Sequence, residues 1–378
     1  MIYLDNAATT KPSETAVESV KEFLGDNYFN PSALYREGLK NHGLLDEARE
    51  FFIKNFATEK HDIIFNSCGS EADNQAVFCA VKRGTFITTK GEHSAIYKSF
   101  SELKSRGFNV IFAKINKDGS VSEEDLYKKI KENPDTSLVS VVHVNNETGA
   151  INDISKIAAN VKNINKNILF HSDGVQAFLK VPYRLSENID MYSVSAHKIN
   201  ALKGTGALFY KKNVPVKPLV YGGGQEEGLR SGTENIFGIK LFEAAAKEHL
   251  KTVREDYRRI YAIKKDAAEN LDKELFTIIS DLSPEKSSPY ILAVSAKGLR
   301  GEVIMHSLEE DGIIVGNGSA CSSKNRYSRV LTAAGYDNET LDGVVRLSFS
   351  NATTSDEVSF AIKKLNERTK KLYETMKG

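Results

Sequence analysis

The chain has 378 residues, 40% hydrophobic and 27% charged, which is enough for two domains with apolar cores. Its 51 Lys and Arg residues balance 50 Asp and Glu residues, and the net charge of +1 argues against direct binding of nucleic acid or an acidic membrane. The N-terminus has no signal-peptide pattern, no apolar run approaches a membrane span of ~18 residues, and the three cysteines are too widely separated for a disulfide framework or a zinc site. We therefore expect a soluble, cytoplasmic protein with reduced cysteines.

Apolar, β-branched runs alternate with helix-like segments through the first half of the chain. Strand-like runs occupy residues 63–65, 85–89, 109–113, 138–144, 168–173 and 191–196. Segments with helical patterns, such as 71–83, 122–132 and 153–163, lie between them. This alternation predicts βα units and a mainly parallel sheet with helices on both faces. Folds of this kind place ligands at the strand ends.

The pattern changes after residue 240. Residues 241–275 carry apolar side chains at helical spacing and predict one long amphipathic helix. We expect this helix to lead into a smaller α+β domain. The predicted large domain spans residues 12–253, and the predicted small domain combines residues 1–11 with 254–378.

Polar residues collect where the predicted strands end. A lone lysine after a strand is usually a solvated surface residue, but Lys198 has companions at other strand ends. These companions are a carboxylate at Asp173, an amide pair at Asn145 and Asn146, and a Gly69-Ser70 turn that opens a helix. Such a turn offers free N–H groups and a hydroxyl, which suit a phosphate.

This set of groups matches the needs of pyridoxal phosphate. That cofactor requires a lysine for its Schiff base and a carboxylate that keeps the ring nitrogen protonated, so that the ring acts as an electron sink. It also requires donors for its phenolic oxygen and a cradle for its phosphate. Each feature alone is a weak signal, and their combination is a stronger one.

The ordered motifs extend over nearly the whole chain. They are IYLDNAATT, FNPS, SEADN, EHSAI, HVNNETG, HSDGVQ, SAHK, GGGQEEGLRSGTEN, GNGSAC and VVRLSFS. In this order the chain resembles the cysteine desulfurases, class V aminotransferase-like enzymes of the fold-type-I pyridoxal-phosphate superfamily. The resemblance implies an α/β large domain with a mainly parallel seven-stranded sheet, and a small domain that carries a catalytic cysteine loop.

The resemblance also implies roles for individual residues. Lys198 would be the Schiff-base lysine, Asp173 would pair with the pyridine nitrogen, and His93 would stack on the ring and move protons. The remaining cofactor-binding residues would be Gly69, Ser70, Asn146, Gln176, Ser195 and His197, with Thr233 supplied by the partner of a homodimer. Arg346, together with Asn146, would bind the substrate carboxylate.

Plainer readings exist for several of these residues. His197 is equally compatible with a satisfied buried histidine, and Asn146 with an Asx-turn. His93 would otherwise be an exposed loop histidine, and Arg346 a strand arginine in a structural ion pair. The glycines near Thr233 lack the spacing of a P-loop.

Cys321 lies in VGNGSACSSKN, a polar loop in which a cysteine should be accessible enough to react. By resemblance it would take sulfur from L-cysteine as a persulfide, leaving L-alanine. The sulfur would pass to an iron–sulfur scaffold protein or to an acceptor for tRNA or cofactor thiolation, and Cys321 would be a transient iron–sulfur ligand. Alternatives are a selenocysteine lyase or another class V lyase, and a non-catalytic sulfur-relay protein.

The sequence departs from the family pattern beside the phosphate cradle and after the lysine. Cys68 stands where glycine is common, and Ala201-Leu202 stands where Gly-Pro is usual. Near a helix N-terminus the Cys68 thiol is a candidate reactive group, although a packed thiol is the more common finding.

Overall fold

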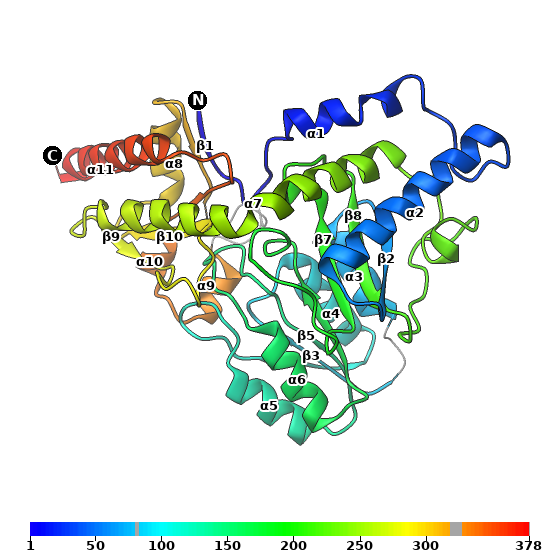
Figure 1. Cartoon of the computed structure of the whole chain (residues 1–378). Helices are drawn as coiled ribbons and strands as arrows, with labels where there is room; N and C mark the ends of the chain where they lie inside the picture. The colour runs from blue at the N-terminus through cyan, green and yellow to red at the C-terminus, as the bar shows by residue number, and fades with distance from the viewer. Residues whose placement is uncertain (80–82, 318–326, 378) are drawn as a thin grey trace.

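The computed structural model describes residues 1–79, 83–317 and 327–377 (Figure 1). The helices are α1 (Glu14–Ser19), α2 (Arg36–Phe56), α3 (Gly69–Cys79), α4 (Ser94–Ser105), α5 (Glu123–Glu132), α6 (Ile154–Ile164), α7 (Ile236–Glu269), α8 (Gly301–Glu309), α9 (Arg329–Ala333), α10 (Asn338–Asp342) and α11 (Ser355–Lys377). The strands are β1 (Ile2–Leu4), β2 (His61–Asn66), β3 (Thr85–Thr89), β4 (Asn109–Ala113), β5 (Thr136–Ser140), β6 (Leu169–Asp173), β7 (Met191–Ser195), β8 (Gly206–Lys211), β9 (Phe276–Ile278), β10 (Ile291–Ala296), β11 (Ile313–Val315) and β12 (Val344–Ser348). Short 3-10 turns occur at Lys21–Leu24, Ala196–Lys198 and Glu226–Gly228.

The central sheet has seven strands in the order β2-β8-β7-β6-β5-β3-β4. The pairings from β7 through β6, β5 and β3 to β4 are parallel, whereas β8 runs antiparallel to both β7 and β2. The expected mainly parallel seven-stranded sheet is therefore confirmed. Because β3, β5, β6 and β7 are parallel, their carboxyl ends lie at one edge of the sheet.

Alternate side chains of the sheet enter two different cores. Ile63, Phe65 and Phe209 belong to a cluster that includes residues of α2, α5, α6 and α7. Ile64 and Leu208 point to the other face and pack with residues of α3 and α4. Successive side chains of a strand point to opposite faces of the sheet, and here the side chains on both faces are apolar. A sheet covered by helices on both faces requires this pattern.

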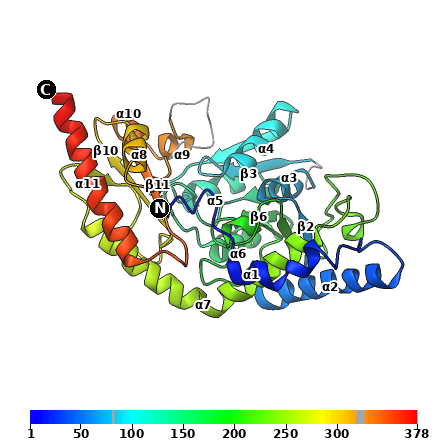
Figure 2. The ribbon, with the colours of Figure 1, turned by 90° about the horizontal axis from the view of Figure 1, so that it is seen from above.

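Helix α7 connects this layered unit to a second core (Figures 1 and 2). Its first half packs in the core of the large sheet, while Ile260, Ile263 and Ala267 pack with β10, β12 and α11. The second unit contains the antiparallel sheet β12-β10-β9 and the parallel pair β1-β11. Leu4 of β1 belongs to the second core, although it lies at the other end of the chain. The exact domain boundaries stay a prediction.

Two expectations about strands were wrong in detail. The run 138–144 was expected to be one strand, but β5 ends at Ser140, and Val144 forms only an isolated bridge with Ile151. The chain turns after Val144 because the Asn145 side chain accepts hydrogen bonds from the backbone N–H groups of Glu147 and Thr148. Strand β8 was not predicted as part of the sheet.

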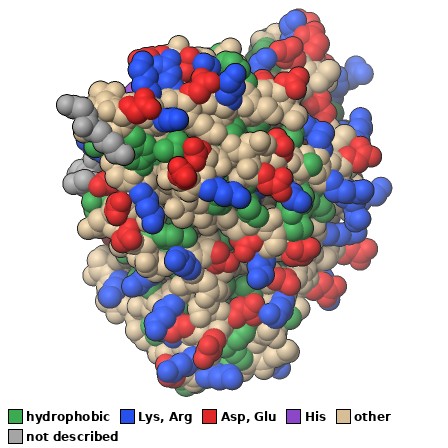
Figure 3. All heavy atoms as spheres, turned by 90° about the vertical axis from the view of Figure 1, so that its left-hand side faces the viewer, with side chains coloured by type: hydrophobic (Ala, Val, Ile, Leu, Met, Phe, Trp, Pro, Cys, Tyr) green, Lys and Arg blue, Asp and Glu red, His purple; other side chains and the backbone are tan. Residues whose placement is uncertain are grey.

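Positive and negative side chains are mixed on the surface, in agreement with the net charge of +1. Figure 3 shows one face of the molecule, on which Lys and Arg side chains are interspersed with Asp and Glu. Among the described residues, the helices are too short or too polar to cross a bilayer.

Candidate active site

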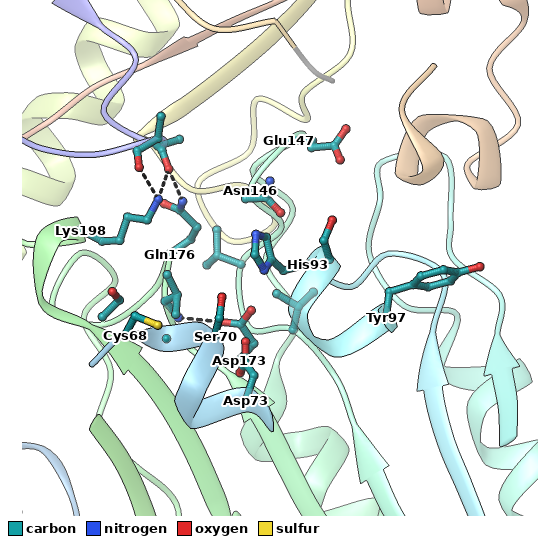
Figure 4. A pocket seen from close by; sticks show the side chains of 18 of the residues that line it. Cys68, Ser70, Asp73, His93, Tyr97, Asn146, Glu147, Asp173, Gln176 and Lys198 are labelled. Atoms are coloured by element: carbon teal, nitrogen blue, oxygen red, sulfur yellow. Dashed lines mark hydrogen bonds between the residues drawn. The ribbon is translucent and has the colours of Figure 1, made fainter. Parts of the chain in front are cut away.

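A cavity of about 450 Å³ lies at the carboxyl edge of the central sheet, against the second unit (Figure 4). Its lining combines residues that follow β2, β3, β6 and β7 with Ala7 and Ala8 from the N-terminal segment, and with Arg346 of β12. Strand ends distant in sequence thus meet in one place, as expected for this sheet topology.

Lys198 extends into the cavity from the 3-10 turn that follows β7. Its Nζ donates to the carbonyl oxygens of Ala7 at 2.6 Å and Ala8 at 2.7 Å. The N-terminal segment is held beside this turn, since Thr10 N–H donates to His197 O at 3.0 Å. The conformation of residues 7–10 therefore determines where the lysine amine lies.

Two buried carboxyl groups lie together below the lysine in Figure 4. Asp173, at the end of β6, accepts a hydrogen bond from Val175 N at 2.9 Å, and Asp73 comes from α3. One oxygen of each and a ring nitrogen of His93 lie within 4.8 Å of one another. Burial raises the pKa of Asp173, and burial together with the nearby Asp173 raises the pKa of Asp73 well above its usual range. Charge on one of two carboxyls so close together disfavours charge on the other.

His93 is fixed by the start of α4. It is the N-cap residue, and its Nδ1 accepts a hydrogen bond from Ala95 N at 3.2 Å. Burial lowers the pKa of this imidazole, while Asp173 opposes the shift. A neutral ring with Nδ1 as acceptor carries its proton on Nε2. The ring is therefore held in one tautomer at the centre of the cavity.

The first turn of α3 forms the part of the cavity wall that suits an anion. Gly69 and Ser70 begin this helix, whose first N–H groups have no intrahelical acceptors. A Cβ on Gly69 would lie 2.6 Å from Val175 Cγ2, so a larger residue does not fit there. His197 lines the same cavity, where burial and then Lys198 lower its pKa to about 4, and its Nδ1 lies 3.1 Å from Thr9 Oγ1.

Arg346 occupies the side of the cavity formed by the second unit. It is 6% exposed, and its Nη atoms donate to Asn146 O at 2.9 Å and Asp5 Oδ1 at 2.7 Å. These bonds cross between the N-terminal segment, β12 and the turn after β5. The Asx-turn in this region is made by Asn145, which leaves the Asn146 side chain on the cavity wall.

Comparison with known proteins identifies the family. Residues 2–360 match the model described as aminotransferase class V. The chain belongs to the class V aminotransferase family. It is 35% identical to a cysteine desulfurase from Nostoc sp., over 98% of this chain and 94% of the relative. A solved NifS-like protein superposes with a TM-score of 0.90 at 32% identity, covering 97% of this chain and 98% of that one. A structure described as SspA in complex with cysteine gives a TM-score of 0.77 at 29% identity, covering 94% of this chain and all of that one.

The class V aminotransferase family depends on pyridoxal phosphate, and two features of this cavity fit that cofactor. Ser195 Oγ is buried on the cavity wall without a hydrogen-bond partner among the described residues. An orphaned hydroxyl of this kind is costly unless a ligand satisfies it. The start of α3 at Gly69 and Ser70, whose first N–H groups have no intrahelical acceptors, lies on the same cavity wall and suits a phosphate.

Most residues predicted for the site line this one cavity. They are Gly69, Ser70, His93, Asn146, Asp173, Gln176, Ser195, His197, Lys198 and Arg346. Thr233 is exposed and does not line the cavity of its own chain. Cys321 lies outside the described residues. Cys68 is half-buried on the cavity wall.

Asp73, Glu147 and Lys180 are among the acidic and basic groups at or near the cavity that were not predicted from the sequence. Asp73 was hidden in a helical pattern, although it lies one turn after Ser70. Glu147 follows Asn146 directly, and burial raises its pKa to about 7. Lys180 lies four residues after Gln176, a spacing that gave no signal because the segment is a series of turns.

Proposed function

We propose that this member of the class V aminotransferases is a cysteine desulfurase, which converts L-cysteine to L-alanine and leaves the sulfur as a persulfide on Cys321. The observation that carries the proposal is the meeting of Lys198, Asp173 and the α3 start in one cavity. The similarity to proteins named cysteine desulfurase supports this activity. Cytoplasmic location and a transient iron–sulfur ligand role for Cys321 are parts of the same proposal.

When bound, pyridoxal phosphate supplies an electron sink that weakens bonds at the substrate Cα and Cβ. In this proposal Lys198 provides the amine that attaches the cofactor. Asp173 supplies a buried carboxylate for the ring nitrogen, with Asp73 beside it. His93 holds a proton on Nε2 beside these groups, where it can be transferred during the reaction.

Arg346 and Asn146 are proposed to bind the substrate. The guanidinium has five N–H donors, two of which are used by Asn146 O and Asp5 Oδ1. These two contacts orient the group so that further donors remain for a carboxylate. A charge-assisted pair in a partly dry cavity is stronger and more directional than one in water.

The position of Cys321 in the chain fits the role of sulfur acceptor. Asn317 precedes the undescribed segment and Ser328 and Arg329 follow it, and all three line the cavity. Ser328 Oγ donates to a carboxylate oxygen of Glu147, and Arg329 donates to the carbonyl oxygens of Lys90 and Glu92. The described residues on both sides of Cys321 therefore line the cavity.

A homodimer is part of the proposal because Thr233 is exposed. Ser32 Oγ donates to Glu234 Oε2 at 3.3 Å, so the loop with Thr233 adjoins the segment 24–39. That segment exposes apolar side chains at Leu24, Tyr28, Leu34 and Leu39. Clustered exposed apolar groups are typical of an interface, and across it Thr233 would reach the partner's phosphate site.

Exchanging Asp173 for asparagine should reduce turnover without loss of fold or cofactor. The substitution keeps the shape but removes the charge that faces the ring nitrogen. We expect kcat to fall roughly 100-fold or more, the size seen when one preorganised electrostatic group is removed. Steady-state alanine formation and the cofactor absorbance measure the two effects separately. Wild-type turnover in Asp173→Asn would show that the pairing is wrong.

Mixing two inactive variants tests the shared site. In a hybrid of Thr233→Ala and Lys198→Ala chains, both lesions fall in one site if Thr233 acts across the interface, and the other site is intact. Mixing should therefore restore activity once subunits exchange. Hybrid dimers that are verified by native mass spectrometry and remain inactive would contradict the arrangement.

The proposed activity is tested by incubating the holoenzyme with L-cysteine and a thiol reductant. Alanine and sulfide should form in equal amounts. Activity restricted to selenocysteine would replace the proposal by a selenocysteine lyase, and absence of alanine from either substrate would favour a sulfur-relay protein. Assays with an iron–sulfur scaffold and with a tRNA-thiolation protein would then identify the acceptor.

A further inference from the structure

Lys180 is a buried lysine that the proposed chemistry does not use. It is 4% exposed, and its Nζ donates to Gln176 Oε1 at 2.9 Å. Gln176 Nε2 in turn donates to Ala7 O at 2.8 Å, the carbonyl that also accepts from Lys198 Nζ. Lys180, Gln176, Ala7 and Lys198 thus form one hydrogen-bonded chain that ends at the proposed cofactor lysine (Figure 4 shows its cavity end).

The surroundings of Lys180 do not account for its burial. The charged and titratable groups that face it are Lys198, Arg346, His197 and His249, which include no carboxylate. Within the described ranges it forms no ion pair. Burial, with Lys198 and Arg346, lowers the pKa of Lys180 to about 7. A group that is so costly to bury and has one hydrogen bond calls for a role.

Lys264 shows what a structural buried lysine looks like in the same chain. It is 1% exposed in the second core, and burial lowers its pKa to about 7 as well. Its Nζ donates to three acceptors, namely Asp281 O, Ser287 Oγ and Ser288 O. Lys264 is thus fully satisfied by the fold, whereas the Nζ of Lys180 has Gln176 as its one hydrogen-bond partner among the described residues.

We propose that Lys180 is a positioning residue that fixes the side-chain amide of Gln176 with its nitrogen toward the cavity. In its protonated form the Lys180 amine only donates, so it selects the amide oxygen and directs the two N–H groups of Gln176 away from itself. One of these is used by Ala7 O. The other is available to an oxygen of a bound cofactor, as a donor rather than an acceptor. This inference rests on the proposed cofactor site at Lys198.

The inference predicts a change in the titration of the bound cofactor. In Lys180→Met the amide oxygen of Gln176 loses the Lys180 donor, so the side chain is held by its bond to Ala7 O without that second anchor, and a positive charge near Lys198 is removed. Both changes favour the protonated form of the bound cofactor. The cofactor pKa measured from its absorbance should therefore rise by roughly half to one pH unit, the size expected for one lost hydrogen bond. Lys180→Arg, which still donates to Gln176, should restore the wild-type titration.

Lys264→Met is the matched control. It removes a lysine of similar burial and should lower stability while leaving the cofactor titration unchanged. Folded, cofactor-loaded Lys180→Met that titrates like wild type would overturn the inference. If Lys180→Met does not fold, Gln176→Glu serves instead, because a carboxylate bonded to Lys180 offers the cavity no N–H; an unchanged titration there would overturn the inference too.

The outcomes separate this role from the proposed function. The titration follows the bound cofactor and requires no L-cysteine, so it is informative even if no alanine forms. A wild-type protein that shows no cofactor absorbance would reject both the site and the role of Lys180. A normal desulfurase whose variants titrate like wild type would reject the role of Lys180 alone.

Discussion

Replacing Lys198 by alanine should abolish covalent attachment of the cofactor and lower turnover at least about 1,000-fold, as expected for loss of a covalent catalytic group. The amine reaches the cavity centre from the turn after β7 and is oriented by two carbonyl oxygens. Asp173, Ser195 and the start of α3 remain in the variant, so it should still bind the cofactor reversibly. Borohydride reduction followed by peptide mapping measures the attachment.

Lys203 provides the control for this experiment. It lies five residues later, is exposed, and does not line the cavity. Lys203→Ala should retain attachment and turnover. A pyridoxyl label on Lys203 or on another lysine of the wild-type protein would contradict the assignment of Lys198.

Replacing Cys321 by alanine should separate substrate binding from desulfuration. The groups proposed to hold cofactor and substrate come from other elements, among them Lys198, Asp173 and Arg346. The variant should therefore bind cofactor and change its absorbance when L-cysteine is added. Alanine formation should fall at least about 100-fold, because a thiolate positioned at the substrate sulfur is lost.

Cys68 offers an internal comparison. It is on the cavity wall but next to Ser67, whose Oγ donates to its Sγ at 3.6 Å, at the start of α3. Fixed there, it should not replace Cys321. Cys68→Ala should therefore retain most of the alanine formation, whereas a large loss in that variant would require a different sulfur acceptor.

The residues at strand ends were predictable from the sequence because parallel strands impose a simple geometry. Each βα unit brings the end of its strand to the same edge, so Asp173 and Lys198 were expected to meet without knowledge of any distance. The motif resemblance added Arg346, which comes from β12 in the second unit. Its approach to Asp5 and Asn146 depends on the packing of the two units, which spacing along the chain does not reveal.

The groups missed by the sequence act through tertiary contacts. Asp73 becomes significant only because α3 packs against β6 and places it beside Asp173, where burial and the nearby Asp173 raise its pKa. Lys180 resembles any surface lysine in the sequence, and only its burial against Gln176 distinguishes it. The early end of β5 has a local cause, since the Asn145 side chain competes with the strand for backbone N–H groups.

The most direct test of the account follows the sulfur atom. Holoenzyme is treated with L-cysteine without reductant, digested, and analysed by mass spectrometry. We expect one added sulfur on the peptide that contains Cys321 in the wild type, and no added sulfur on any cysteine of Cys321→Ala. A persulfide on Cys68 in the wild type, or alanine formed at the wild-type rate by Cys321→Ala, would contradict it.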